Sequence, residues 1–321
     1  MARSPFSWEG DAGGEQLLYQ TEWMEQPEPL KHIPGTNLWG GDFPTPALPR
    51  TVCAWVEVSN ESTVLPSARH SRYLLGPDLP PLPGTEGGPA TLGEDVTLPT
   101  PGLASDERQV RIYLPHGYKQ GQPYHVLYLT DGQMELGPEK RFPAMTDTLR
   151  HRGEMPPMIL VAMDNAGKER PMEYLIGGSR NLAARTWVWE TVIPFVDARY
   201  PAVHRWAVGG SNGASFAAQL VLGRPDLFDG GVFYSPWHRT GLEAILHMAD
   251  SWPDGGSFAI SHSTLGVGEQ KHLPGARALA ERLQAHGAVV HFLELEGYGH
   301  NFPAWQRTVP LLLRKLFSEV V

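Results

Sequence analysis

Cysteine is nearly absent from this chain of 321 residues, in which Cys53 is the only one. No intrachain disulfide is therefore possible, and a metal site built on several cysteines is excluded. Cys53 lies within an apolar run at 52–56, which indicates a packed side chain rather than a reactive one. The sequence also has no stretch long and apolar enough to span a membrane, and its first residues lack the apolar core of a secretory signal. We therefore expect a protein of the reducing cytoplasm with no membrane partner.

Positive charge is scarce and scattered along the chain. The formal net charge is −9, and no run of lysine or arginine occurs. This argues against an extended nucleic-acid surface, although it is compatible with a local basic pocket. The length suits one large domain or two, at about 150 residues per domain. The hydrophobic content of 41% is ordinary for a globular core, and the 35 glycines and 30 prolines indicate many loops.

The first 104 residues differ in pattern from the rest. Short apolar runs at 16–19 and 51–58 are separated by proline and glycine and show little helical periodicity, which predicts a small β-rich region. Residues 60–101 are denser still in proline and glycine, and we interpret them as loop or linker. We expect a β-rich N-terminal region at 1–104 and a second domain at 105–321.

Strands alternate with helices in the second domain. Buried apolar strands that are interleaved with helices predict a mainly parallel α/β sheet flanked by helices, whose site lies at the carboxyl ends of the strands. The predicted strands are 109–114, 124–130, 158–163, 231–235, 257–261 and 288–295, with a further strand that ends before Gly209. The predicted helices are 181–200 (interrupted by Pro194), 239–250, 275–286 and 303–319, with a further one directly after Gly213.

The stretch Gly209-Gly-Ser211-Asn-Gly213 joins an apolar strand to an Ala-rich helical segment. A serine at the apex of such a turn, with glycines two residues to either side, is the G-x-S-x-G pattern of a nucleophile elbow. We expect a side chain at either flanking glycine to collide with the neighbouring strand or helix. Ser211 is therefore the candidate nucleophile, presented at a helix N-terminus that favours negative charge.

A serine nucleophile needs a base that a third group orients, and in the α/β-hydrolase arrangement these follow in the order serine, acid, histidine. His300 is the candidate base because it follows the last predicted strand in a Gly-rich loop. Glu269 is the candidate acid, since it is the only carboxylate between Gly255 and Ala280, and we place it in a flexible loop. Asp250 and Asp254 are reserves that precede the strand.

The oxyanion hole of such a site uses the backbone N–H of the residue after the nucleophile and one N–H from an early strand-to-helix loop. The first donor is then Asn212. The stretch 130–134 ends an early strand, so Gln133 is the candidate for the second, although the same residues also fit a plain Asp-Gly turn.

Taken together, these residues make the chain resemble the α/β-hydrolase family named Putative esterase, particularly its enterochelin (ferric enterobactin) esterases. The likeness covers about 105–321 and departs from the family in reading Gly-Tyr-Gly-His where Gly-Gly-His is usual. It rests on ordered motifs at 111–118, 127–133, 163–174, 192–201, 209–213 and 297–300, followed by Trp305. The resemblance implies a cytoplasmic serine esterase without metal or cofactor, preceded by a β-sandwich. In the enterobactin branch the substrate is a tri-ester of catecholoyl-serine, a ferric siderophore ligand.

The resemblance also implies that an arginine of the 163–174 segment lies near the mouth of the site. Arg170 is then expected either to meet an anionic catecholate or to brace the loop by pairing with Glu173. We expect Asp131, Trp237 and His238 to contact substrate as well. Three further cations are expected to extend a basic rim: Lys168, Arg180 and Arg185.

Other functions stay open at this point. A carbohydrate ester, a feruloyl ester or a thioester is the alternative substrate for an esterase of this kind. A hydrolase-fold protein that binds a ligand without turnover is the alternative of another class.

Overall fold

We describe the protein from a computed structural model. The structure describes residues 2–9, 18–19, 26, 28–36, 38–45, 52–55, 72–80, 82, 91–137, 141–238 and 241–317. The chain divides into two compact units. The smaller comprises 1–81, 263–271 and 294–304, and the larger comprises 82–262, 272–293 and 305–321.

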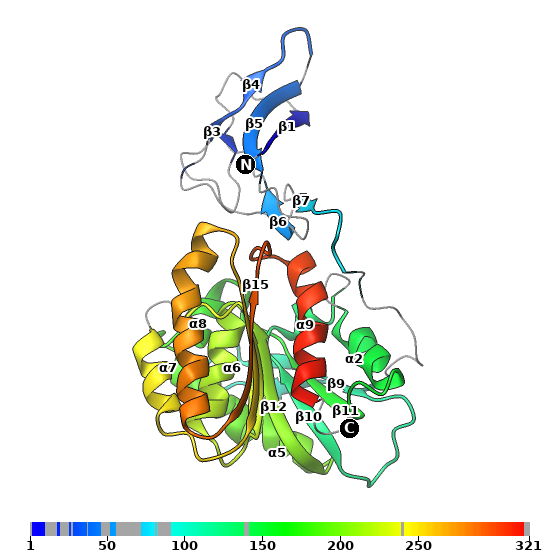
Figure 1. The fold of residues 1–321 in the computed structure, drawn as a ribbon. Coiled ribbons are helices and arrows are strands. Elements are labelled where there is room, and N and C mark those ends of the chain that lie inside the picture. Colours follow the sequence, from blue (N-terminus) through cyan, green and yellow to red (C-terminus); the bar gives the residue numbers. More distant parts are fainter. Residues whose placement is uncertain are drawn as a thin grey trace. The chain divides into compact units, whose positions relative to one another are not determined.

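A sheet of eight strands is the centre of the fold (Figure 1). In sheet order the strands are β15 (Val289–Leu295), β14 (Ser257–Ser263), β13 (Gly230–Tyr234), β12 (Ala202–Gly210), β10 (Tyr124–Leu129), β11 (Met158–Met163), β9 (Glu107–Leu114) and β8 (Thr91–Pro99). The run from β14 to β11 is parallel, whereas β9 and β8 join antiparallel. The predicted strands of the second domain are thus confirmed, and so is the mainly parallel α/β sheet.

The loop or linker interpretation of 60–101 is wrong for two strands, β7 (Arg72–Leu75) and β8. Strand β8 pairs with β9 over its whole length and forms one edge of the sheet. An edge strand pairs along one side only, so the missing N–H of the terminal Pro99 is tolerated, and Gly93 lies at the irregularity where the register with β9 shifts. The sheet therefore begins before the boundary that we expected near residue 105.

Helices cover both faces of the sheet, with α6 and α7 on one side and α2 and α9 on the other (Figure 1). They are α1 (Gly132–Glu135), α2 (Phe142–His151), η1 (Gly167–Glu169), α3 (Arg170–Tyr174), α4 (Asn181–Trp187), η2 (Val188–Val192), α5 (Ile193–Asp197), α6 (Asn212–Gly223), α7 (Leu242–Ala249), α8 (Val267–Ala285) and α9 (Phe302–Phe317). None of the helices among the described residues is long and apolar enough to cross a membrane.

Two helical segments differ from the pattern that periodicity predicts. The segment 181–200 contains a π-helical turn, η2, immediately before Pro194, where the missing N–H of proline interrupts the regular ladder. Helix α8 begins at Val267 rather than near 275 and carries Pro274 inside it. Glu269 therefore lies in the first turn of a helix, and its placement in a flexible loop is wrong.

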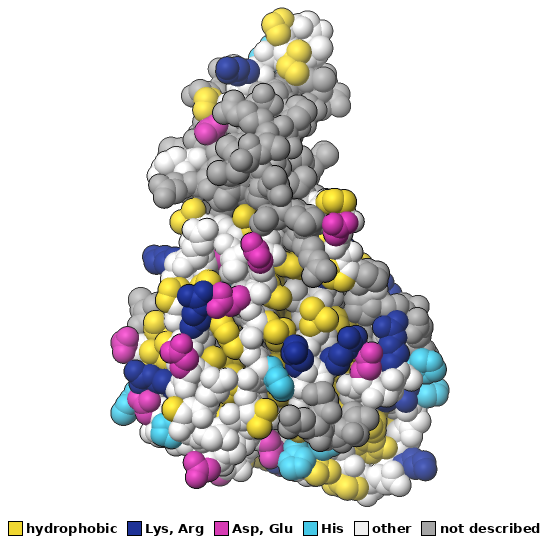
Figure 2. All heavy atoms as spheres, in the orientation of Figure 1, with side chains coloured by type: hydrophobic (Ala, Val, Ile, Leu, Met, Phe, Trp, Pro, Cys, Tyr) yellow, Lys and Arg dark blue, Asp and Glu magenta, His cyan; other side chains and the backbone are white. Residues whose placement is uncertain are grey.

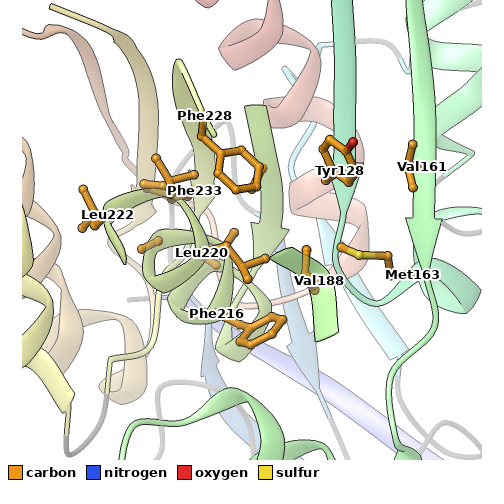
Figure 3. Close-up of a cluster of buried hydrophobic side chains, with 14 of the residues drawn as sticks. Tyr128, Val161, Met163, Val188, Phe216, Leu220, Leu222, Phe228 and Phe233 are labelled. Atoms are coloured by element: carbon orange, nitrogen blue, oxygen red, sulfur yellow. The ribbon is translucent and has the colours of Figure 1, made fainter. Parts of the chain in front are cut away.

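The core lies between the sheet and its helices on both faces. Along β10, Val126 and Tyr128 join the cluster under α6, while Leu127 and Leu129 are equally buried and alternate with them. Phe216 and Leu220 of α6 are in the same cluster (Figure 3). Because both faces are covered, the strand reads as a continuous apolar run.

The N-terminal region is β-rich, as expected. Strand β5 (Leu38–Thr45) pairs antiparallel with β1 (Ala2–Glu9) and with β4 (Lys31–His32). Two further pairs are β2 (Leu18–Tyr19) with β3 (Glu28–Pro29) and β6 (Val52–Trp55) with β7 (Arg72–Leu75). Cys53 is on β6, and its side chain lies outside what the structure describes, so its packing stays a prediction.

Candidate active site

The predicted elbow has the backbone of a nucleophile turn. Strand β12 ends at Gly210, Ser211 has φ 58° and ψ −127°, and α6 begins at Asn212. A positive φ is costly for a residue with a Cβ, and it persists only where the surroundings hold it. Here the Ser211 N–H donates to the Tyr234 carbonyl of β13 at 3.1 Å.

The two flanking glycines are required by space. A Cβ on Gly209 would lie 2.4 Å from the Gly213 carbonyl oxygen, and one on Gly213 would lie 2.4 Å from Asp131 Oδ2. Real Cβ atoms do not approach so closely, so the expected collisions are confirmed. At Gly213 the obstacle is a charged side chain that follows β10, rather than a strand or helix backbone.

Positive φ angles gather at the carboxyl ends of the central strands. Asp131 follows β10 with φ 59°, Ser211 follows β12, and Ser235 follows β13 with φ 44°. The only other residue of this kind among the described non-glycines is Arg141, at 51°. Strained backbone of this sort is concentrated at functional sites, and it marks this edge of the sheet as the candidate site.

Asp131 and Arg170 form a bidentate ion pair at this edge. Arg170 Nε donates to Asp131 Oδ1 and its Nη2 donates to Oδ2, both at 2.6 Å. The Asp131 side chain is 2% exposed and that of Arg170 is 18% exposed. Burial by itself lowers the pKa of Arg170, but the charge and hydrogen bonds of Asp131 raise it above its ordinary value.

The alternative pairing of Arg170 with Glu173 is wrong. Glu173 is fully buried and receives two bonds from Arg108 of β9, at 2.6 and 2.9 Å. It also accepts the Ala104 N–H at 3.0 Å. The two charged residues of α3 thus form ion pairs with different partners. Their spacing of three residues along the chain did not predict this.

Asn165, which follows β11, is a site residue that the sequence analysis missed. Its Nδ2 donates to Asp131 Oδ1 at 2.6 Å. Its backbone N–H donates to Gln133 Oε1 at 2.9 Å, and Gln133 Nε2 returns a bond to Asn165 Oδ1 at 2.8 Å. Its position in the sequence could have identified it. Asn165 follows closely after a parallel strand, and polar residues there lie at the edge of the sheet where ligands bind.

The two candidate oxyanion donors are the backbone N–H groups of Gln133 and Asn212. Gln133 is in the short helix α1, and its side chain is exposed. Asn212 is 7% exposed, and its Oδ1 has no hydrogen-bond partner among the described atoms. The oxyanion role of both N–H groups stays a prediction.

Trp237 and His238 follow β13, where Trp237 contacts the elbow and His238 contacts the helix after it. The Trp237 N–H donates to the Ser211 carbonyl at 3.3 Å, and its ring stacks on His272 at 5.0 Å. His238 is 4% exposed, and its Nδ1 lies 3.2 Å from Ser215 Oγ of α6. Burial, with smaller effects of His272 and His262, lowers the pKa of His238 to about 3, so its imidazole is neutral. Substrate contact by either residue stays a prediction.

The cations expected at a basic rim are largely engaged elsewhere. Arg180 pairs with Glu169 at 3.0 Å, and the Arg185 guanidinium lies 5.5 Å from the centre of the Trp189 ring. Lys168 is exposed. On the face in Figure 2, basic and acidic side chains are interspersed rather than gathered into one patch. The segment therefore carries less uncompensated positive charge than its sequence indicates.

Within the smaller unit, His300 and Glu269 are hydrogen bonded through Nδ1 and Oε1. Glu269 is 1% exposed, and its Oε2 accepts the Ser263 N–H at 3.0 Å. The reserve acid Asp250 is instead at the surface, where it pairs with Arg282. The structure thus brings together the acid and base candidates of the sequence analysis.

His300 lies in the loop after β15, and Glu269 lies in α8 just after the loop that follows β14; hydrogen bonds join these two loops. The Thr264 N–H donates to the Leu295 carbonyl at 3.2 Å, and the Leu265 N–H donates to the Tyr298 carbonyl at 3.0 Å. In return the Gly297 N–H donates to Thr264 Oγ1 at 3.2 Å. This pairing explains how residues 31 apart in the chain meet.

The described residues contain no group of three or more histidine, cysteine or acidic side chains arranged to hold a metal ion.

A mainly parallel sheet with a serine held at positive φ between a strand and a helix, and glycines two residues to either side, defines an α/β hydrolase. The chain belongs to the esterase family, whose model, described as "Putative esterase", matches residues 103–316. Carboxylic ester hydrolysis is the activity that this membership supports, and the resemblance stated from the sequence is confirmed.

Known proteins agree with this class. The uncharacterized protein YjcH of Bacillus subtilis (strain 168) is 27% identical over 154 residues, which are 46% of this chain and 63% of that protein. The match thus spans less than two thirds of that relative. The enterobactin esterase FES from Shigella flexneri, solved in the presence of enterobactin, superposes with a TM-score of 0.75 at 16% identity, covering 99% of this chain and 94% of that chain. A ferulic acid esterase superposes with a TM-score of 0.55 at 14% identity over 72% of this chain and 99% of that one. At identities this low, the two superpositions establish a shared fold and nothing further.

Proposed function

We propose that the protein is a serine esterase that hydrolyses carboxylic esters through an acyl-enzyme. The observation that carries the proposal is the backbone of Ser211, held at φ 58° between β12 and α6 by two glycines that no other residue can replace without collision. A turn this strained has no need of a serine unless the hydroxyl is used, because strain is retained where function demands it.

In this proposal His300 is the base and Glu269 is the group that orients it. Because the carboxylate holds Nδ1, Nε2 is the nitrogen that takes the proton from Ser211 Oγ as the oxygen attacks the ester carbonyl. The same proton then passes to the leaving alcohol, and the acyl-enzyme forms. His300 next deprotonates a water that attacks the acyl carbonyl, and Ser211 regains its proton as the acid departs.

The order of these groups along the chain supports the proposal. In the α/β-hydrolase arrangement the nucleophile, the acid and the histidine follow one another in this order, as Ser211, Glu269 and His300 do. The developing oxyanion would be stabilised by the N–H groups of Asn212 and Gln133, each contributing on the order of 10²–10³ in kcat.

The test is hydrolysis of p-nitrophenyl butyrate by wild type and by Ser211→Ala. We expect the variant to retain no more than the residual of roughly 10³–10⁴ over water that binding and the oxyanion hole provide. A fluorophosphonate probe should label wild type and not the variant, while Ser251→Ala, at an exposed serine, serves as the control and behaves as wild type. Near-normal turnover by Ser211→Ala would overturn the proposal, and a wild-type serine that resists the probe would favour a binding protein without turnover.

For the substrate, we propose an enterobactin-like siderophore ester. The support is the ordered motifs shared with enterochelin esterases and the similarity of fold to an enterobactin esterase. A feruloyl ester is the second candidate, favoured by the similarity to a ferulic acid esterase. Arg170 and Arg180 are already paired with carboxylates, which reduces the positive charge available to an anionic substrate. Less anionic esters therefore belong in the test as well.

A panel of purified substrates separates these candidates. It comprises enterobactin with and without iron, methyl ferulate, an acetylated xylo-oligosaccharide and an acyl-CoA. The siderophore proposal predicts that kcat/KM is highest for enterobactin by at least about tenfold, which corresponds to about 1.4 kcal/mol of transition-state binding. A higher kcat/KM for methyl ferulate would reassign the substrate while leaving the serine esterase intact.

A further inference from the structure

Side chains from three neighbouring strands are joined at the carboxyl edge of the sheet. Strands β12, β10 and β11 lie side by side and parallel (Figure 1). Asp131 follows β10, Asn165 and Arg170 follow β11, and Gly213 follows β12. The carboxylate of Asp131 binds Asn165 and Arg170 of the second segment and lies against Gly213 of the third.

Three hydrogen bonds from the segment after β11 hold the Asp131 carboxylate. Oδ1 receives Arg170 Nε and Asn165 Nδ2, and Oδ2 receives Arg170 Nη2, all three at 2.6 Å. The backbone N–H of Asp131 donates to Tyr174 Oη at 3.2 Å, and the Arg170 guanidinium lies 5.0 Å from the centre of the Tyr174 ring. Charge-assisted, bidentate bonds of this type fix orientation as well as distance.

The Asp131–Arg170 pair also packs against the first turn of α6. The missing Cβ of Gly213 would lie 2.4 Å from Asp131 Oδ2 and 3.3 Å from Arg170 Nη2. Asn212 is the neighbouring residue, and Gln133 is two residues after Asp131. The ion pair therefore touches both of the segments that carry the proposed oxyanion donors.

We infer that the Asp131–Arg170 pair, supported by Asn165, is a positioning device that sets the spacing of the two oxyanion donors. This inference rests on the proposed serine esterase function, in which those donors stabilise the tetrahedral intermediate. Asp131 holds the αL turn at the start of α1, with φ 59° and ψ 42°, and so directs the Gln133 N–H. Arg170 holds the carboxylate against α6 and so keeps this turn in register with the Asn212 N–H.

This role differs from the substrate contact that the sequence analysis expected of both residues. Asp131 is 2% exposed, and each of its oxygens is bonded within the protein. The Asp131 carboxylate neutralises the guanidinium that binds it, so Arg170 has little positive charge with which to attract an anionic ligand. A planar fork is needed for this arrangement, and lysine supplies only a point charge.

The test compares Arg170→Lys with wild type on p-nitrophenyl butyrate, with active enzyme counted by fluorophosphonate titration. A misplacement of about 1 Å at a reacting centre costs on the order of 10² in rate. We expect kcat per titrated serine to fall about 10–100-fold while KM stays within about twofold. The Ki of a trifluoromethyl ketone, which forms an oxyanion on the serine, should rise by the same factor as kcat falls.

Three further variants complete the design. Asn165→Ala removes the lateral support at a half-buried position, and we expect a kcat loss of about 3–10-fold by the same pattern. The double variant Asp131→Asn/Arg170→Gln should be no worse than Arg170→Gln, because residues that act as a unit are not additive. Arg224→Lys, whose partner Asp226 is at the surface, is the control and should be unchanged.

Two results would overturn the inference. A wild-type kcat in Arg170→Lys and in Asn165→Ala means that the pair does not position the donors. A raised KM with unchanged kcat means that Arg170 contacts substrate instead. If Arg170→Lys does not fold, Asn165→Ala still decides, by whether its Ki rises by the same factor as its kcat falls. A wild type that neither hydrolyses esters nor labels at Ser211 is a different result, which overturns the proposed function and this inference with it.

Discussion

The elbow around Ser211 and the Glu269–His300 pair are built on opposite principles. The elbow occupies five consecutive residues, and its geometry is held by positive φ and by the absence of two side chains. The pair joins residues 31 apart, and its geometry is held by hydrogen bonds between two loops. The first depends on volume, whereas the second depends on charge and on bonding partners.

This difference predicts how each part fails. Added atoms disturb the elbow because its neighbours are backbone and a buried ion pair that have nowhere to move. Removed charge disturbs the pair because an imidazole without its carboxylate adopts the wrong tautomer and loses support for its positive form. Substitutions of equal size and of equal charge therefore separate the two.

The largest effect is expected at the acid. Glu269→Gln keeps the volume but removes the charge that holds the His300 tautomer, and kcat should fall by about 10⁴ with little change in KM. Asp250→Asn, whose side chain pairs with Arg282 at the surface, is the matched control and should keep wild-type activity. Steady-state kinetics on one ester measures both. Loss of activity in Asp250→Asn alone would move the role of the acid to that residue.

The next effect is expected at Gly213. Gly213→Ala adds one methyl group against Asp131 Oδ2, so kcat should fall by about 10² and the free energy of unfolding by about 1–3 kcal/mol. Gly121→Asn is the control, because Gly121 has φ 78° in open space and asparagine accepts that conformation. Urea unfolding and turnover per titrated serine measure the two quantities. An unchanged kcat in Gly213→Ala would show that the elbow tolerates volume after all.

A smaller effect is expected where the two loops of the smaller unit join. Thr264→Val removes the acceptor of the Gly297 N–H, and a bond of this kind contributes about 0.5–1.5 kcal/mol. If that bond positions His300, kcat should fall about 2–10-fold. The exposed Thr97 of β8 provides the control Thr97→Val. The same loss in Glu269→Gln/Thr264→Val as in Glu269→Gln alone would support action through the pair, and full additivity would contradict it.

The smallest effect on turnover is expected for a substitution of His238, which should instead alter how the free energy of unfolding depends on pH. The pKa of His238 is about 3 when folded and about 6.5 in an unfolded chain. Between these values the unfolded state binds a proton that the native state does not, so the free energy of unfolding falls as pH falls from 6.5 toward 3, by up to about 1.4 kcal/mol per pH unit. Urea unfolding at pH 7, 6 and 5 should show a shallower slope for His238→Gln than for wild type. The exposed His247→Gln should keep the wild-type slope, and equal slopes in all three proteins would contradict the prediction.

Much of the fold was predictable because it rests on local patterns. The strand at Met158–Met163 and the helix at Phe302–Phe317 are recognised from apolar runs and helical spacing alone. The start of α8 was not predictable in this way, since Pro274 and Gly275 interrupt its pattern. Buried residues such as Leu279 and Leu283 hold this helix through packing, which propensity does not count.

The same division holds for the site. The sequence by itself determined the elbow, because strand, turn and helix are encoded in adjacent residues, and it predicted His300 and Glu269 as base and acid candidates through their order along the chain. Only the tertiary structure decided the ionic partners, seating Arg170 on Asp131 and Glu173 on Arg108. Charged side chains pair with whatever the strand order brings within a few ångströms, and that order is a property of the folded sheet rather than of neighbouring residues.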